Sequence, residues 1–370
     1  MNYYCHICRK HFITHELLWR HQIKHDNITM NYIPNNKLQK PIIKQKIRLI
    51  IEIDNLLDLI EFSKKIDVDY LIKPDIEYNI DLQMLKNLLP DMINLNNMIG
   101  QNKIKNQVAN LILYYSLHLN KKEDDLLHTI IDGEPGTGKT EFAQKIAKIY
   151  LKMGVLKKDI FKKVKRSDLI AGYLGQTAIK TRDIIKECLG GVLFIDEAYA
   201  LGNEEKKDSF SKECIDTLCE ALSDHKDNLM VIIAGYENSL NNCFFNYNPG
   251  LQSRFTWRFK TDEYNAQDLY KIFIKKVNDG GWSLAEDSYI NVKWFEKNKS
   301  HFKYYGRDIE TLFAKTKIAH SRRVFCKPNN VKTKITMKDL ENGFEMYINN
   351  DEVKKRADNN DSKVIQNMYL

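Results

Sequence analysis

The sequence lacks the features that would place a chain in a membrane or outside the cell. No segment offers about eighteen consecutive uncharged apolar residues, the length that spans a bilayer. Residues 1–5 lack the architecture of a secretory signal peptide. Of the seven cysteines, two belong to a metal-binding motif, and the odd, scattered remainder predicts reduced thiols and no disulfide framework. We therefore expect an intracellular protein, cytoplasmic or nuclear, without a membrane partner.

The chain also lacks a strong excess of one charge. It carries 57 Lys and Arg against 49 Asp and Glu, a formal net charge of +8. Isoleucine, lysine and asparagine are used heavily, as in A/T-rich genomes, so much of the charge can reflect codon usage and not a nucleic-acid surface. Apolar residues make up 43% of the sequence and supply a core, and 370 residues allow two or three domains.

A glycine-rich segment between an apolar run and a helix-like run is the most informative pattern. Glycines let backbone N–H groups surround a phosphate, and the helix N-terminus adds partial positive charge. We expect Lys139 to reach the β- and γ-phosphates of ATP and the Thr140 hydroxyl to bind Mg²⁺. The predicted nucleotide-binding residues are Gly133, Glu134, Pro135, Gly136, Thr137, Gly138, Lys139 and Thr140.

Two carboxylates follow a second apolar run, at residues 191–195. Asp196 and Glu197 stand where a buried parallel strand would end, and open α/β sheets bind ligands at that edge. Asp196 is therefore predicted to hold Mg²⁺, and Glu197 to polarise the attacking water. The alternative is a core strand that ends in two exposed acids, which the phosphate loop upstream disfavours. The pair predicts hydrolysis as well as binding.

Residues 1–27 have the spacing of a two-cysteine, two-histidine zinc finger. Two residues lie between Cys5 and Cys8, twelve between Cys8 and His21, and three between His21 and His25. In a small ββα unit this spacing sets both imidazoles on one helical face, opposite the thiolates, to bind Zn²⁺. A single finger covers only about three base pairs. Protein docking or non-specific nucleic-acid binding is therefore favoured over sequence-specific DNA binding.

The remaining boundaries follow from composition and periodicity. Residues 28–90 are predicted to be a linker and a small adaptor segment, in which an apolar run at 47–53 reads as a strand or the start of a helix. Residues 91–262 are predicted to form an α/β nucleotide-binding domain with a parallel sheet, and 263–350 a helical lid. The polar residues 351–370 predict a disordered tail.

Six ordered motifs lie at residues 98–101, 171–181, 194–201, 234–236, 248–255 and 305–309. Together they resemble the AAA+ ATPases with a P-loop core, in the CbxX/CfqX branch of red-type rubisco activases and sporulation stage V protein K-like ATPases. The resemblance covers about residues 90–350. It implies that the protein works as a ring, a homo-hexamer.

The resemblance also implies residue roles. Ile99 and Gly100 would cup the adenine. Arg254 would reach the nucleotide of a neighbouring subunit as an arginine finger, although an ordinary surface arginine is the alternative. Arg307 would contact the nucleotide of its own subunit from the lid, with a helix-surface ion pair as the alternative.

Two regions leave alternatives open. The first sensor departs from the common AAA+ pattern, because Tyr236 stands in register and Asn238 comes two residues late. Tyr173, Leu174 and Gly175 suit a pore loop that grips an extended polypeptide, and a buried turn is the alternative. The basic run Lys162, Lys163, Lys165 and Arg166 could instead line a channel for nucleic acid.

The sequence thus predicts a ring motor that hydrolyses ATP to remodel or thread polypeptides and is recruited through its zinc finger. ATP, Mg²⁺ and Zn²⁺ are the expected cofactors. One alternative is a DNA- or chromatin-associated motor, and another is an ATP-gated assembly scaffold without catalysis, against which Glu197 and Arg254 argue. A eukaryote-style finger on a bacterial-looking motor, with A/T-rich usage, points to a large DNA virus and its host cell.

Overall fold

The computed structural model describes residues 3–4, 11–12, 45–69, 76–119, 127–173, 175–203, 208–286 and 288–356. The chain divides into two units, residues 1–45 and 46–370. In the first unit, β1 (Tyr3–Tyr4) pairs antiparallel with β2 (His11–Phe12). The predicted zinc ligands Cys5, Cys8, His21 and His25 lie outside the described residues, so the finger stays a prediction.

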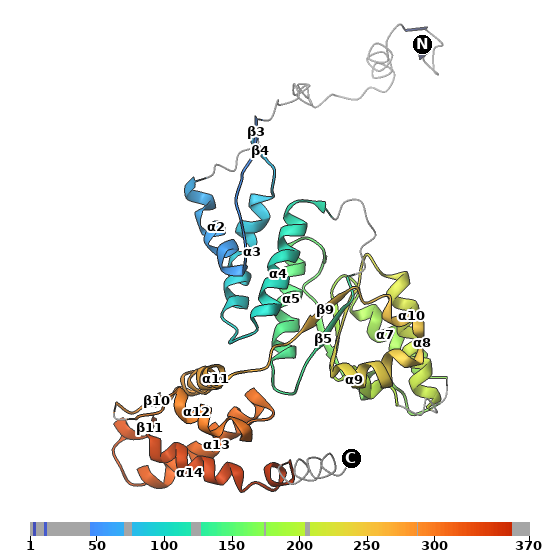
Figure 1. The fold of residues 1–370 in the computed structure, drawn as a ribbon. Helices are drawn as coiled ribbons and strands as arrows, with labels where there is room; N and C mark the ends of the chain where they lie inside the picture. The colour runs from blue at the N-terminus through green and yellow to red at the C-terminus, as the bar shows by residue number, and fades with distance from the viewer. Residues whose placement is uncertain are drawn as a thin grey trace, which may run out of the picture. The chain divides into compact units, whose positions relative to one another are not determined.

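A five-stranded parallel sheet forms the centre of the second unit (Figure 1). Its strands follow the order β6 (Phe161–Val164), β7 (Val192–Ile195), β8 (Met230–Gly235), β5 (Thr129–Asp132) and β9 (Trp257–Lys260). All five run in one direction, so the loops that follow β5 and β7 emerge at the same edge of the sheet. The predicted α/β core with a parallel sheet is confirmed.

Both faces of this sheet are buried, because successive side chains of a strand point to opposite sides. Leu193 and Ile233 pack into one apolar cluster, whereas their neighbours Phe194 and Ile232 pack into another. Each fully buried side chain of this size contributes about 1.5–3 kcal/mol. The covering helices are α4 (Asn102–Ser116) and α5 (Lys139–Lys152) on the Phe194 face, and α7 (Thr177–Glu187) and α8 (Ser209–Asp224) on the other.

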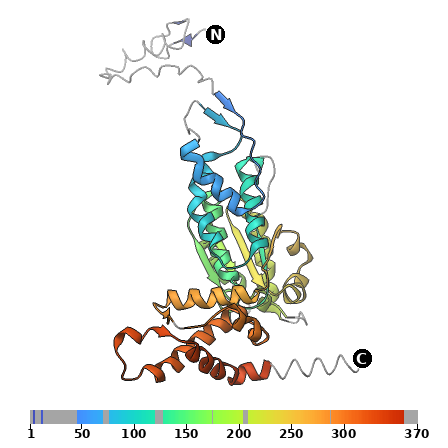
Figure 2. The same cartoon turned by 60° about the vertical axis from the view of Figure 1, so that its left-hand side comes forward.

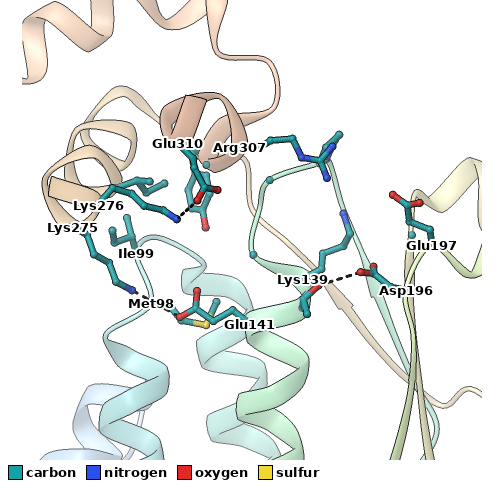
Figure 3. A pocket seen from close by; sticks show the side chains of 18 of the residues that line it. Met98, Ile99, Lys139, Glu141, Asp196, Glu197, Lys275, Lys276, Arg307 and Glu310 are labelled. Atoms are coloured by element: carbon teal, nitrogen blue, oxygen red, sulfur yellow. Dashed lines mark hydrogen bonds and ion pairs between the residues drawn. The ribbon is translucent and has the colours of Figure 1, made fainter. Parts of the chain in front are cut away.

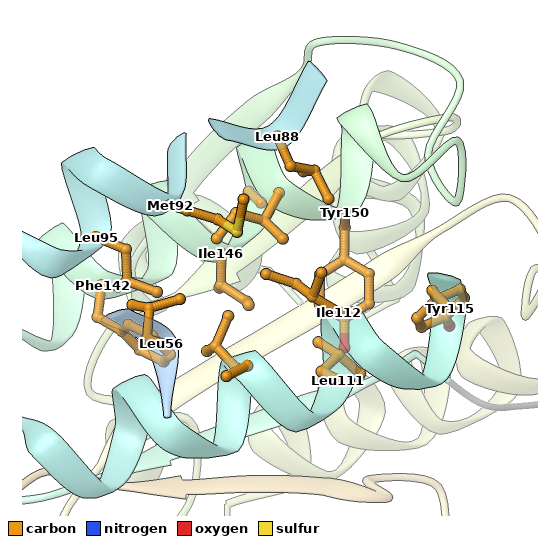
Figure 4. Packing of buried hydrophobic residues seen from close by; sticks show 14 of the residues in the cluster. Leu56, Leu88, Met92, Leu95, Leu111, Ile112, Tyr115, Phe142, Ile146 and Tyr150 are labelled. Atoms are coloured by element: carbon orange, nitrogen blue, oxygen red, sulfur yellow. The ribbon is translucent and has the colours of Figure 1, made fainter. Parts of the chain in front are cut away.

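Two further helices, α2 (Leu56–Asp69) and α3 (Leu82–Asn96), extend the cluster on the Phe194 face. Figure 4 shows Leu88 and Met92 of α3 packed in this cluster with Tyr150 of α5. The predicted boundary between adaptor and motor at residues 90 and 91 therefore falls inside a helix. Pro90 removes one helical hydrogen bond, but the buried stripe continues past it, and tertiary packing keeps the helix intact.

The ambiguous run at residues 47–53 is strand only at its first residue. Strand β3 (Gln45–Ile47) pairs with β4 (Ile76–Tyr78), and the chain from 48 to 54 takes neither form before α2 begins. The Leu49 N–H donates to the Asn79 side-chain oxygen at 2.8 Å, which fixes this irregular stretch.

The lid helices gather in the orange-to-red part of the chain (Figure 2), and they share an apolar core of their own. Its helices are α11 (Ala266–Asp279), α12 (Val292–Asn298), α13 (Tyr305–Val324) and α14 (Met337–Ile348). Capping boxes start two of them, at Asn265 with Asp268 and at Thr336 with Asp339. Helix α12 was not predicted. No helix of the described segments is both long and apolar enough to cross a membrane.

The predicted start of the disordered tail, at residue 351, is too early. Residues 351–356 are helical, and Arg356 Nη1 donates to Asp308 Oδ1 at 2.9 Å. The Arg356 guanidinium also lies 4.0 Å from the centre of the Tyr304 ring. Asp308 is buried at the start of α13, so its pairing orders this polar segment despite its composition.

Short segments complete the second unit. They are α6 (Arg166–Leu169), η2 (Ala198–Leu201), α9 (Glu237–Ser239), η3 (Leu240–Phe244), η4 (Phe245–Tyr247), α10 (Pro249–Gln252), β10 (Ser283–Leu284), η5 (Lys299–His301), η6 (Asn329–Val331) and β11 (Lys334–Ile335).

Candidate nucleotide-binding site

A cavity of about 600 Å³ opens where the loops after β5 and β7 meet the lid (Figure 3). Its walls come from the segment before α4, the phosphate loop, the segments that follow β7 and β8, Tyr264, and the lid helices α11 and α13. The predicted site residues that line it are Ile99, Pro135, Gly136, Gly138, Lys139, Thr140, Asp196, Glu197, Tyr236 and Arg307. Residues far apart in the sequence thus converge on one cavity.

The phosphate loop passes directly beneath the start of the lid helix α13. The Gly306 N–H donates to the Gly136 carbonyl at 3.1 Å. A Cβ on Gly136 would lie 2.0 Å from the Tyr304 carbonyl oxygen, and the φ of +73° favours glycine as well. Helix α5 begins at Lys139, so its unpaired N–H groups lie at the cavity, where they suit an anion.

Lys139 is held at the phosphate end of the cavity. Its ammonium donates to the carbonyl oxygens of Gly133 at 2.8 Å and Glu134 at 2.9 Å, and lies 5.4 Å from the centre of the Tyr236 ring. Burial lowers the pKa of Lys139, and nearby carboxylates, Asp196 foremost, oppose that shift. Phosphate oxygens can replace the two carbonyl oxygens as acceptors.

The other loop residues shape the turn. The Thr137 hydroxyl donates to the Glu134 carbonyl at 2.8 Å and meets the Thr261 hydroxyl at 3.0 Å. The Tyr264 hydroxyl donates to the Thr137 carbonyl at 3.1 Å. Burial raises the pKa of Tyr264 to about 12, so this donor keeps its proton at neutral pH. The loop is thereby tied to the chain that leads into the lid.

Thr140 and Asp196 meet at the N-terminus of α5. The Thr140 hydroxyl donates to Asp196 Oδ2 at 3.4 Å. A hydroxyl and a carboxylate oxygen beside a phosphate-binding loop are ligands that Mg²⁺ accepts, so these residues fit the predicted ion. A third group also lies here: the Lys163 ammonium is 2.5 Å from Asp196 Oδ2 and 3.5 Å from Thr140 Oγ1.

Glu197 lies next to Asp196 with its side chain exposed at the cavity wall. Its φ of +54° falls in the left-handed region, which costs a non-glycine residue roughly 1 kcal/mol or more. The Ala200 N–H donates to the Glu197 carbonyl at 2.8 Å and stabilises this turn. Burial, followed by the Glu197 charge, raises the pKa of neighbouring Tyr199 to about 12.

The opposite end of the cavity is lined by Met98 and Ile99 (Figure 3), and Ile272 of α11 adds a further apolar lining residue. Two ion pairs border it, Lys276 with Glu310 at 3.1 Å and Lys275 with Glu141 at 3.9 Å. An apolar slot with polar groups at its rim suits an adenine ring. The lid side of this slot was missed from the sequence, where only the helical periodicity of 266–277 marked it.

The predicted adenine segment is anchored by its next residue. Gly100, with a φ of +63°, lies outside the cavity lining and beside the Tyr264 ring. The buried Gln101 amide donates to the Asp262 carbonyl at 3.0 Å and accepts from the Asp262 N–H at 2.8 Å. These bonds join the segment to the entrance of the lid.

The two predicted arginines occupy different places. Arg307, in the first turn of α13, lines the cavity, and its charge helps to lower the pKa of Lys139. Arg254 follows α10 outside the cavity lining, where its Nε donates to Ser223 Oγ at 2.7 Å and its Nη1 to the Gly250 carbonyl. It is partly exposed.

Of the two candidate sensor residues, Tyr236 lines the cavity, whereas Asn238 lies in α9 outside the lining. Tyr173 is 74% exposed, which excludes the buried-turn alternative for its side chain. Leu174 lies outside the described residues, and Gly175 has a φ of +80° with open space where a Cβ would lie.

The basic run is largely neutralised within the chain. Lys162 pairs with Glu187, Lys163 with Asp196, and Arg166 with Asp208. Arg166 also donates to the carbonyl oxygens of Ala200 and Leu201 at 2.8 and 3.0 Å. These pairs weaken the argument for a nucleic-acid channel at the run.

Comparisons with known proteins agree with this geometry. Residues 129–262 match the "ATPase family associated with various cellular activities (AAA)". The chain is 39% identical over 336 residues to a cfxQ-like protein of Acanthamoeba polyphaga mimivirus, covering 89% of this chain and 79% of that protein. It is 31% identical over 272 residues to the CfxQ homolog of Galdieria sulphuraria, covering 71% and 88%. Stage V sporulation protein K of Bacillus subtilis is 36% identical over 202 residues, 53% of this chain and 62% of that protein.

Proposed function

The chain belongs to the CfxQ-like branch of the AAA ATPases, and on this premise we propose that it hydrolyses ATP in order to remodel or thread polypeptides. One observation supports hydrolysis most strongly. Three segments far apart in the sequence meet in one cavity, and they bring Lys139 and Thr140, Asp196 and Glu197, and Arg307. A protein that only bound nucleotide would not need a carboxylate beside the phosphate loop on a backbone held at a positive φ.

Each residue has a distinct part in the proposed reaction. Glu197 orients the attacking water and takes up its proton. Lys139 and Arg307 stabilise the negative charge that spreads over the γ-phosphate oxygens. Thr140 and Asp196 would hold Mg²⁺, which would supply positive charge against the phosphates. Tyr236, under the Lys139 ammonium, is the better candidate for the first sensor.

We propose that the cavity is completed by a neighbour in a homo-hexameric ring. The position of Arg254 supports this, because the side chain is partly exposed and lies outside the lining of its own cavity. A cation supplied by the next subunit would complete the charge stabilisation and couple hydrolysis around the ring.

The client would be an extended polypeptide gripped by the Tyr173 loop. The exposed Tyr173 ring, between α6 and α7, supports the proposal, since an aromatic side chain free of its own core can contact a passing backbone. The proposed zinc finger, with ligands Cys5, Cys8, His21 and His25, would recruit the ring to a protein or nucleic-acid partner. Metal analysis of the intact chain against Cys5→Ser tests for Zn²⁺: one equivalent lost on substitution supports the finger.

A viral source and a host-cell location belong to the same proposal. Two observations support them: the similarity to a mimivirus protein over most of the chain, and a sequence that combines a predicted zinc finger with an AAA ATPase domain.

Steady-state ATPase of the assembled protein tests the proposed function, measured alone, with unfolded polypeptide, and with single- or double-stranded DNA. We expect polypeptide to raise the rate and Tyr173→Ala to remove that stimulation. Stimulation by DNA, with salt-sensitive binding, would favour the DNA motor instead. A rate equal to that of Glu197→Gln under every condition would favour the scaffold.

A further inference from the structure

Lys163 contacts both residues that fit Mg²⁺. Its ammonium lies 2.5 Å from Asp196 Oδ2 and 3.5 Å from Thr140 Oγ1. It also lies 5.7 Å from the centre of the Phe194 ring, which lies opposite it on the neighbouring strand. The Lys163 nitrogen therefore lies beside the same two oxygen atoms that would bind a metal ion.

The strand geometry sets this position. Lys163 belongs to β6, whose side chains alternate between the two faces of the sheet. Lys163 shares its face with Phe161, which stacks on Phe194. Lys162 reaches the other side and pairs with Glu187 of α7. The two consecutive lysine side chains thus lie on opposite faces of the sheet, and of the two only Lys163 contacts Asp196 and Thr140.

We infer that Lys163 is a built-in counter-ion that stands in for Mg²⁺ at Asp196 and Thr140 and yields that place when the metal arrives with the nucleotide. The inference rests on the proposed nucleotide-binding function. An ammonium and a divalent ion repel each other and compete for the same carboxylate, so Lys163 opposes metal binding. Without metal, the same ammonium offsets part of the phosphate charge and supports nucleotide binding.

The simpler alternative is an ion pair that only tethers the edge strand β6. The Lys163 side chain is 39% exposed, and pairs at such exposure contribute little to stability. A tether and a counter-ion differ in one measurable respect. Removing a tether changes nucleotide affinity equally with and without Mg²⁺, whereas removing a counter-ion changes the ratio of the two affinities.

Affinity for a fluorescent ATP analogue, measured on the full chain in excess EDTA and in saturating Mg²⁺, tests the inference. The Mg²⁺ advantage is the Kd in EDTA divided by the Kd in Mg²⁺. We expect Lys163→Met to raise this ratio by about five-fold or more over the wild type, the factor for one unit charge a few ångströms away in a water-like dielectric. The matched control Lys162→Met removes the same charge from the opposite face and should leave the ratio unchanged.

A ratio for Lys163→Met equal to those of the wild type and Lys162→Met would overturn the inference. Should Lys163→Met fail to fold, Lys163→Gln keeps a polar side chain at the strand edge and carries the same expectation. No binding of nucleotide by the wild type under either condition would instead overturn the proposed function, and the inference with it.

Discussion

The phosphate end of the cavity and the loop that carries Arg254 each contribute a predicted catalytic arginine, but they are built differently. The first is assembled within one chain, where Arg307 of α13 meets the phosphate loop and the end of β7. In the second, Arg254 is bonded to Ser223 and Gly250, outside the lining of that cavity. One chain therefore supplies a nucleotide-binding site, and we propose that hydrolysis needs a second chain.

Glu197→Gln should give the largest loss of ATPase rate, because it removes the proposed base at the phosphate end of the cavity and leaves Arg254 in place. Loss of a positioned base lowers kcat by about 10²- to 10⁴-fold, while the amide keeps the shape of the side chain and nucleotide affinity should hold. Steady-state ATPase and nucleotide titration measure the two quantities. A rate within a factor of about two of the wild type would remove Glu197 from the chemistry.

Arg254→Ala should disable only the second region. We expect kcat to fall by about 10²- to 10³-fold, the usual loss for one preorganised charge-stabilising group. Affinity of a chain for nucleotide in its own cavity should be unchanged, because Arg254 lies outside the lining of that cavity. Arg182→Ala is the matched control, since Arg182 is an exposed arginine paired with exposed Glu220. Equal rates for the two variants would show that Arg254 is an ordinary surface residue.

Protonation of His128 at acidic pH should lower the free energy of unfolding, and this residue lies near the loop that carries Arg254. This buried ring accepts from the Val231 N–H at Nδ1 and faces the Leu222 carbonyl with Nε2, so the neutral form fits. Burial lowers the pKa of His128 from 6.5 to about 4. The unfolded chain therefore takes up the proton first, and the free energy of unfolding should fall by about 2 kcal/mol between pH 7.5 and pH 5.

Urea unfolding at these two pH values measures the effect, and His128→Gln is the control. The variant should be less stable at pH 7.5, because its amide cannot reproduce both ring contacts, yet lose less stability on acidification. An equal loss in wild type and variant would assign the pH dependence to other groups.

Arg307→Ala should have the smallest effect and act at the phosphate end. Loss of one exposed cation at the cavity wall should weaken ATP binding by about ten-fold, the usual value of a single charged hydrogen bond. Arg322→Ala, in the last turn of the same helix, keeps the cavity intact and should bind as the wild type does. Matching affinities for the two variants would contradict a role for Arg307 in binding.

The difference between the two regions also explains what the sequence could predict. The phosphate loop is one continuous stretch of sequence, and so is the Asp196–Glu197 pair. Each follows a predicted parallel strand, so strand direction alone predicted that both lie at one edge of the sheet. Lys163 was assigned to a basic run because its partner Asp196 is distant in sequence, and only the strand register brings the two together.

Long-range packing accounts for the other differences. Helix α3 passes through Pro90 because its buried face continues, and residues 351–356 are helical because Arg356 pairs with buried Asp308. Neither contact has a local signature. The lid wall at Ile272 and Lys275 depends likewise on where α11 comes to lie over the phosphate loop.

Mixing the two inactive variants tests the shared site most directly. In a mixed ring, Glu197→Gln subunits offer an intact Arg254 to neighbours that carry Arg254→Ala and an intact Glu197. The account predicts an ATPase rate that passes through a maximum at intermediate ratios and rises well above either variant alone. A rate that follows the weighted mean of the two variants at every ratio, in assembled rings, would contradict it.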